Sequence, residues 1–145
     1  MARADGIAVK NIDHVRVQGL YNAGGGAGVA VLFDNTSGGQ LVSCVVTDTV
    51  VFDGCDGADV VGCTLDYSAG GGRSLMLSGC TDAVLRNNLF LNTESDTGLY
   101  VTGDAPDSDY NLWYPHDRAG EGSIRRAPTP SWSQASTGPR PTQAR

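Results

Sequence analysis

Three side chains of this sequence have chemistry that a catalytic site could use. Lys10 and Asp53 can exchange protons, and Arg73 is a cation that can grip a carboxylate through two hydrogen bonds. Removal of a proton beside a carboxylate needs a base for the proton and a cation for the developing enolate. Lys10, Asp53 and Arg73 are therefore the catalytic candidates. Solvated surface side chains, with Arg73 anchoring a loop, are the simpler interpretation.

Sugar and metal binding have equally few candidates. Tyr100 is the aromatic residue best placed to stack on a sugar ring. Asp48 and Asp66 follow corresponding strands of a repeat described below and could share a Ca²⁺ ion, although their repeat positions differ by one residue. Asp in turns more commonly caps backbone N–H groups. We therefore expect no obligatory cofactor, with Ca²⁺ as the one candidate.

Composition indicates a β protein that binds neither nucleic acid nor membrane. The 145 residues include 20 Gly, 14 Asp and 9 Arg, but only 2 Glu and one Lys, so the usual residues of exposed helix faces are scarce. The net charge of −6 repels phosphate backbones. The longest apolar run, Val29 to Phe33, is too short to span a bilayer, and no apolar stretch typical of a signal peptide follows the first residues.

An internal repeat predicts the elements that position these side chains. Five apolar-x-apolar runs begin 22, 21, 25 and 24 residues apart, at Ile7, Val29, Val50, Leu75 and Leu99. A second pattern follows, in which Leu41-x-x-Cys44-x-Val46 is repeated from Val60, from Leu85 and, more weakly, from Ser108. Each unit therefore contains a strand, a turn, a second strand, a bend at Cys or Asn, and a short third strand. Stacked units of this kind share a continuous core.

The repeat predicts an all-β parallel β-helix solenoid of about five coils over residues 6–117. Residues 118–145 are expected to form a Pro- and Arg-rich irregular or short-helix tail, in which Trp132 docks on the last coil and the end is disordered. A leucine-rich repeat is the rival fold, because it also carries an apolar-x-x-Cys/Asn-x-apolar pattern. The second alternating strand in each unit favours the β-helix.

Stacking gives the cysteines a structural interpretation. Cys44 and Cys63 occupy one repeat position, and Cys55 and Cys80 occupy another. Equivalent Cβ atoms in neighbouring coils lie about 4.8 Å apart, wider than the roughly 3.8 Å of a disulfide, so free buried thiols are favoured over disulfides. Asn88 and Asn111 extend the first row and are expected to bond the backbone at the bend.

Alternation along the first strands separates inward from outward side chains. Phe52, Phe90 and Trp113 are expected inside. Lys10 and Asp53 lie two coils apart, too far for an ion pair, and Arg86 lies opposite Asp59 and Asp109. The two outward rows are predicted to be Ala8, Ala30, Val51, Met76 and Tyr100, and then Lys10, Leu32, Asp53, Ser78 and Thr102.

The runs Gly6–Val9 and Ala83–Asn92 resemble the coils of the right-handed parallel β-helix proteins of the pectate-lyase-like superfold. Residues 108–114, followed by 130–138, resemble the last coil and closing segment of secreted bacterial members. The resemblance implies a carbohydrate-active protein of a family that is usually secreted, with polysaccharide lyases and glycoside hydrolases among its members. Enzymes of that family usually have ten or more coils.

Three functions are consistent with these features. The first is a fragment or small relative of a carbohydrate-active β-helix protein, binding polysaccharide with little or no catalysis alone. The second is a non-catalytic assembly module that pairs, with itself or a partner chain, through its exposed coil ends, above all an uncapped N-terminal coil. The third is an intact small lyase that uses Lys10, Asp53 and Arg73.

Overall fold

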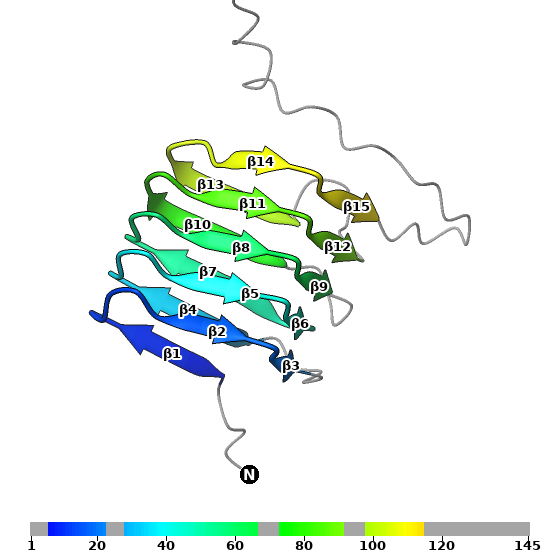
Figure 1. The fold of residues 1–145 in the computed structure, drawn as a ribbon, viewed down its shortest axis with the longest axis horizontal. Coiled ribbons are helices and arrows are strands. Elements are labelled where there is room, and N and C mark those ends of the chain that lie inside the picture. Colours follow the sequence, from blue (N-terminus) through cyan, green and yellow to red (C-terminus); the bar gives the residue numbers. More distant parts are fainter. Residues whose placement is uncertain (1–5, 23–27, 67–72, 92–97, 115–145) are drawn as a thin grey trace, which may run out of the picture.

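The computed structural model describes residues 6–22, 28–66, 73–91 and 98–114, and these residues form three parallel β-sheets of five strands each (Figure 1). The first sheet contains β1 (Ile7–Lys10), β4 (Val29–Asp34), β7 (Thr49–Asp53), β10 (Leu75–Cys80) and β13 (Leu99–Gly103). The second contains β2 (Arg16–Gln18), β5 (Gln40–Val42), β8 (Asp59–Val61), β11 (Val84–Arg86) and β14 (Asp107–Asp109). The third contains β3 (Tyr21–Asn22), β6 (Val45–Val46), β9 (Thr64–Asp66), β12 (Leu89–Leu91) and β15 (Leu112–Tyr114).

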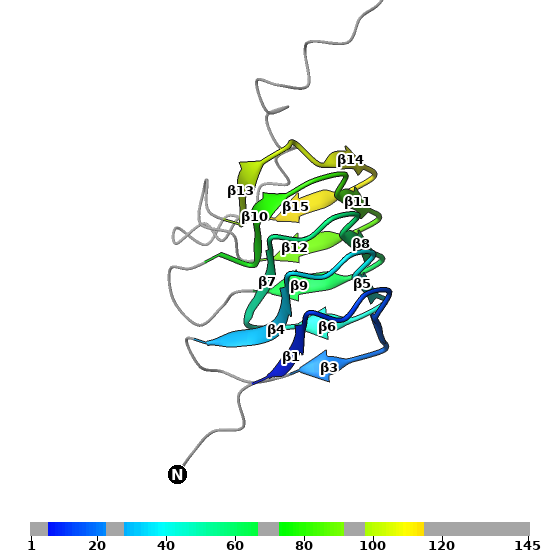
Figure 2. The ribbon, with the colours of Figure 1, turned by 90° about the vertical axis from the view of Figure 1, so that its left-hand side faces the viewer.

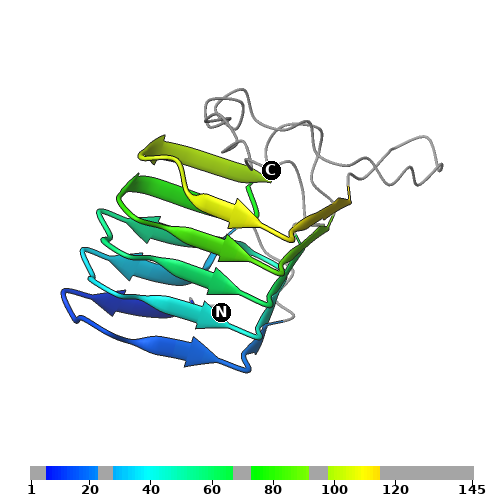
Figure 3. The same cartoon turned by 45° about the horizontal axis from the view of Figure 1, so that its top comes forward.

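Consecutive strands belong to different sheets, so the chain winds as a parallel β-helix (Figures 2 and 3). From β1 to β13 it makes four complete turns, and β14 and β15 complete the fifth rung, where a rung is one strand from each sheet. This confirms the predicted solenoid, and the described residues contain no helix of the kind that a leucine-rich repeat requires. The predicted tail, residues 118–145 with Trp132, lies outside the described residues, as do 115–117.

No helix in the part of the chain that the structure describes is long and apolar enough to cross a membrane.

The core fills the space that the three sheets enclose. Phe33 stacks on Phe52 with ring centroids 4.5 Å apart, and Phe90 stacks on Trp113 at 3.8 Å. Phe52 and Phe90 are fully buried and Trp113 packs against the core, as predicted. Each inward residue thus rests on its equivalent in the next rung, which is how short strands obtain a shared core.

Tight turns between the sheets depend on residues that tolerate a positive φ. Residues of this kind recur at equivalent positions in successive rungs, as in the bend between the second and third sheets, where Gly62 has φ of 64° and Asn87 has φ of 56°. Gly has no Cβ and adopts this conformation freely, and among L-residues Asn and Asp do so at the lowest cost. The other members of that column are Gly19, Ser43 and Tyr110.

One predicted register is wrong. Ile7 pairs with Val31 rather than Val29, and the register shifts between Val29 and Val31 where β4 meets β7. Ala30, predicted to point outward, is therefore buried, and Val29, predicted to point inward, is 45% exposed. The physical reason is Phe33, because the observed register places its large ring inside, on Phe52.

Candidate ligand-binding face

The outer face of the first sheet carries two rows of side chains, one per strand. The corrected register places Leu32, and not Ala30, in the first row, and Asp34, and not Leu32, in the second. The first row is largely apolar and consists of Ala8, Leu32, Val51, Met76 and Tyr100. The second row is polar and consists of Lys10, Asp34, Asp53, Ser78 and Thr102.

Two predicted site residues, Arg73 and Tyr100, lie in direct contact. The guanidinium carbon of Arg73 lies 3.7 Å from the centroid of the Tyr100 ring, which is the geometry of a cation–π contact. Tyr100 lies in β13, and Arg73 lies just before β10, the neighbouring strand. Neither ion pair found among the described residues involves Arg73. Its N–H groups are thus oriented by the ring without being held by a described carboxylate.

Lys10 and Asp53 belong to a different part of the same face. Lys10 Nζ lies 3.2 Å from the Asp34 carboxylate, in the adjacent strand, and both side chains are solvent-exposed. This agrees with the prediction that Lys10 does not pair with Asp53. Sequence reasoning missed Asp34 because the wrong register of β4 removed it from this row.

The structure does not bring Lys10, Asp53 and Arg73 into one site. Asp53 pairs in register with Ser78, five residues beyond Arg73, a distance of roughly 16 Å along an extended strand. Asp34 and Asp53 are in register on neighbouring strands, whose backbones lie about 4.8 Å apart. Asp34 is held by Lys10, so this pair is an incomplete acid–base arrangement.

The predicted Ca²⁺ ligands are not equivalent in the structure. Val46 pairs with Leu65, so Asp66 aligns with Thr47 and Asp48 lies one position further, as the sequence indicated. Asp48 is 8% exposed, and its Oδ1 atom has no hydrogen-bond partner. Among the described residues, no group of three or more His, Cys, Asp or Glu side chains converges on a common point. The Ca²⁺ site therefore stays a prediction.

Cys44, Cys63, Asn88 and Asn111 form a structural column at the second bend. All four Cys are free and buried, as predicted. Asn88 Nδ2 donates to Val60 O at 2.8 Å, and Asn111 Nδ2 donates to Leu85 O at 2.9 Å. Cys63 Sγ makes the corresponding contact with Leu41 O at 3.4 Å. Each bend side chain thus bonds the carbonyl at the centre of the second-sheet strand one rung below.

Burial makes these thiols poor nucleophiles. It raises the pKa of the Cys63 thiol from 9.0 to about 11 and also raises the pKa of Cys80. Because the thiolate is the reactive form, these two residues are protonated at neutral pH. Their chemistry is therefore that of small buried hydrogen-bonding groups.

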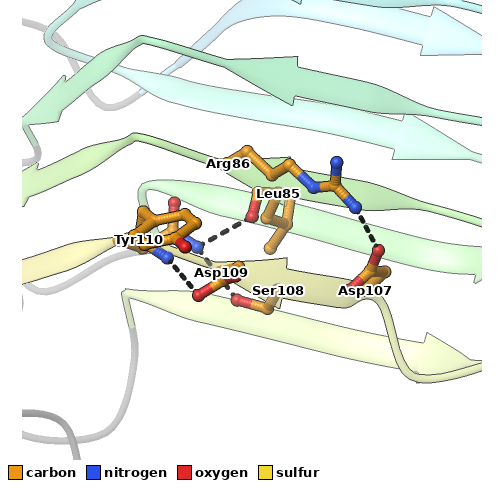
Figure 4. A network of polar contacts seen from close by, with 7 residues as sticks. Leu85, Arg86, Asp107, Ser108, Asp109 and Tyr110 are labelled. Atoms are coloured by element: carbon orange, nitrogen blue, oxygen red, sulfur yellow. Dashed lines mark hydrogen bonds and ion pairs between the residues drawn. The ribbon is translucent and has the colours of Figure 1, made fainter.

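A polar network covers the second bend of the last rung (Figure 4). Arg86 Nη2 lies 2.6 Å from Asp107 Oδ2, so its partner is Asp107 and not Asp59 or Asp109, the two predicted residues. Arg86 does lie opposite Asp109 in the ladder, but its ion pair crosses diagonally from β11 to Asp107, which lies opposite Val84. Asp59 accepts a hydrogen bond from Gln40 Nε2 at 2.9 Å.

A polar hollow of about 320 Å³ lies beside the turns that join the first sheet to the second in the first three rungs. Asn11, Asp13, Asn35 and Ser37 are among its lining residues. Asn35 Nδ2 donates to Asn11 Oδ1 at 2.8 Å, and the Ser37 N–H donates to Asp13 Oδ1 at 2.8 Å. These contacts support the turn itself, so the contact between Arg73 and Tyr100 is the better ligand-binding candidate.

Comparisons with protein-family models, curated proteins and solved structures return no match for this chain.

Proposed function

We propose that the outer face of the first sheet binds polysaccharide that contains uronic acid, with little or no catalysis by this chain alone. The observation that carries the proposal is the Arg73 guanidinium held 3.7 Å from the Tyr100 ring centroid. A guanidinium fixed in this way keeps N–H groups for a carboxylate, which it grips through two parallel hydrogen bonds. The uronate carboxylate is the group in such polysaccharides that matches this donor pattern.

The surroundings of Arg73 support a sugar ligand. Met76 and Val51 continue the apolar row beside Tyr100, and they offer a surface for the C–H face of a sugar ring. Ser78 and Thr102 supply hydroxyl groups one row away. Arg73 occupies one face of the Tyr100 ring, so the sugar stacks on the other face or on the guanidinium. Tyr100 remains the predicted sugar-stacking residue.

The fold resemblance supports the same class of ligand. The coils resemble those of carbohydrate-active β-helix proteins, which suggests a fragment or small relative of such a protein. The proposal includes the extracellular setting that is usual in that superfold. Fold alone does not determine function, so the proposal depends on Arg73 and Tyr100.

Affinity electrophoresis through gels that contain polygalacturonate or alginate tests the binding. We expect retardation of the wild-type chain, and an affinity about tenfold lower for Arg73→Ala, the loss expected for a charge-assisted pair. Tyr100→Phe keeps the ring and should bind as wild type, whereas Tyr100→Ala should resemble Arg73→Ala. Arg86→Ala, which removes the same charge from the second sheet, is the matched control. Equal retardation of all variants, or none for wild type, would refute the proposal.

A lyase assay tests the limit on catalysis. Ultraviolet absorbance of the unsaturated product is followed with each polysaccharide, with and without Ca²⁺. We expect no product, because Lys10 and Asp53 lie far from Arg73 along the strands. Product formation that Lys10→Ala abolishes would show that the chain is a lyase and not only a binding module.

A further inference from the structure

We propose that the two ends of the β-helix bind each other, so that copies of this chain stack head to tail. The first rung, β1 to β3, and the last rung, β13 to β15, each have only one described neighbour per strand. Their outer edges therefore present backbone N–H and C=O groups that can pair with another strand. The occupant proposed for each edge is the opposite end of a second copy.

The exposed hydrophobic side chains are concentrated at these ends. Six large hydrophobic residues are exposed among those that the structure describes, and all but Val29 lie in the first or last rung. These five residues are Ile7, Ile12, Tyr21, Tyr110 and Leu112. Apolar groups beside an open ladder edge are buried when another strand pairs there, which stabilises the contact.

Charge distinguishes head-to-tail stacking from the alternatives. Lys10 and Arg16 lie in strands of the first rung, whose described residues, 6–22, also include one carboxylate, that of Asp13. The last rung contains three carboxylates, and no Lys or Arg lies among its described residues, 98–114. Two last rungs facing each other would bring six carboxylates together, whereas a first rung on a last rung brings opposite charges together. The three carboxylates are those of Asp104, Asp107 and Asp109.

The register of the second sheet places specific partners opposite each other. Arg16 belongs to the same column as Asp107, through Gln40, Asp59 and Val84. Continuing the ladder by one rung puts Arg16 of the second copy beside Asp107. Asp107 lies 2.6 Å from Arg86, so Arg16 completes a carboxylate held by two guanidinium groups.

The core continues across the same junction. Ile7 and Leu99 belong to one column of the first sheet, and Val9 and Val101 belong to the inward column two residues further on. Ile7 is 39% exposed, and the added rung covers it with Leu99 of the neighbouring copy. The contact joins different surfaces of the two copies, so stacking continues without closure and produces rods of variable length.

Sedimentation velocity on the intact chain, from micromolar to near-millimolar concentration and without polysaccharide, tests the proposal. We expect the weight-average mass to rise continuously with concentration. Arg16→Asp places a carboxylate opposite Asp107 and should weaken association about tenfold, whereas Arg16→Lys should keep it. Asp107→Arg should also weaken association, while Asp53→Arg makes the same charge change in a middle rung and should not. Thermal unfolding followed by circular dichroism shows that each variant is folded.

Mixing two variants separates this interface from general charge effects. Arg16→Asp and Asp107→Arg are complementary at both junctions, so an equimolar mixture should associate more strongly than either variant alone. Three results would overturn the proposal. The first is a monomer at every concentration, which would mean that something other than a second copy, such as the chain's own residues 115–145, occupies an end. The others are a dimer whose mass does not increase further with concentration, and a mixture of the two variants that associates no more than either variant alone.

Discussion

At the residue scale, the bend between the second and third sheets shows how one position serves two side-chain types. Thiol and amide groups both donate to the carbonyl of the rung below, at Val60 O for Asn88 and at Leu41 O for Cys63. The amide also accepts, since the Cys63 N–H donates to Asn88 Oδ1 at 2.9 Å. Asn and Cys are therefore interchangeable in role, although the thiol bonds more weakly.

Asn88 provides the sharpest test of this column. Asn88→Ala leaves the Cys63 N–H buried without its acceptor and removes the side-chain hydrogen bond to Val60 O, and should lower the free energy of unfolding by about 3 kcal/mol. Asn88→Cys restores a donor of the kind present at Cys63, so its cost should be clearly smaller. Urea denaturation at neutral pH measures both values. Equal costs for the two variants would mean that the column acts only by packing.

Cys63 makes stability depend on pH. Its thiol has a pKa of about 11 when buried and 9.0 in the unfolded chain. Below pH 9 the thiol is protonated in both states and has no effect. As pH rises from 9 towards 11 the unfolded chain loses the proton first, so stability falls, by on the order of 2 kcal/mol. Urea denaturation across this range should show a smaller fall for Cys63→Ser, and identical slopes would contradict the assignment.

At the element scale, each strand gains stability from having a neighbour on both edges. Leu85, in β11, is fully buried between β8 and β14, whereas Ile7 begins β1 at the edge and is 39% exposed. Truncation to Ala should therefore lower the free energy of unfolding by different amounts at these two positions. Leu85→Ala should lower the free energy of unfolding by about 3 kcal/mol, and Ile7→Ala by less than about 1 kcal/mol. Chemical denaturation that gave similar losses would show that the end rungs are as well packed as the middle.

The sequence pattern predicts most of this architecture because alternation and period are local signals. The three strands per rung, the inward Phe52 and Phe90, and the stacked thiols all follow from it. The register of the second coil could not be predicted from the sequence, because Val29–Val31 and Val31–Phe33 both fit the apolar-x-apolar pattern. Only the packing of Phe33 on Phe52 decides between them.

The candidate site was only partly predictable for a related reason. Tyr100 lies on a regular strand, so its outward row follows from alternation. Arg73 precedes its strand and obeys no such rule, and its contact with Tyr100 depends on the tertiary path of the chain. Asp34 was missed because the register of its strand was predicted wrongly. Arg86 pairs with Asp107, which lies diagonally across from it on the neighbouring strand, and strand-pairing patterns do not specify such diagonal contacts.

At the scale of the whole molecule, net charge acts against an acidic ligand. The chain carries −6, so long-range repulsion opposes a polyuronate while Arg73 attracts its carboxylate at short range. Salt screens the long-range term more strongly than the close contact. Raising the salt concentration to physiological strength should therefore leave the affinity unchanged or increase it, as measured by isothermal titration calorimetry. A steep loss of affinity with salt would instead indicate a basic surface elsewhere on the chain.

The central claim, that the face formed by Arg73 and Tyr100 binds uronate, is tested most directly by nuclear magnetic resonance. Backbone and side-chain resonances of the ¹⁵N-labelled chain are followed during titration with an oligogalacturonate. The account predicts that the largest shifts occur at Arg73, Met76 and Tyr100, with the second and third sheets unchanged. Absence of shifts, or shifts confined to the second or third sheet, would contradict it.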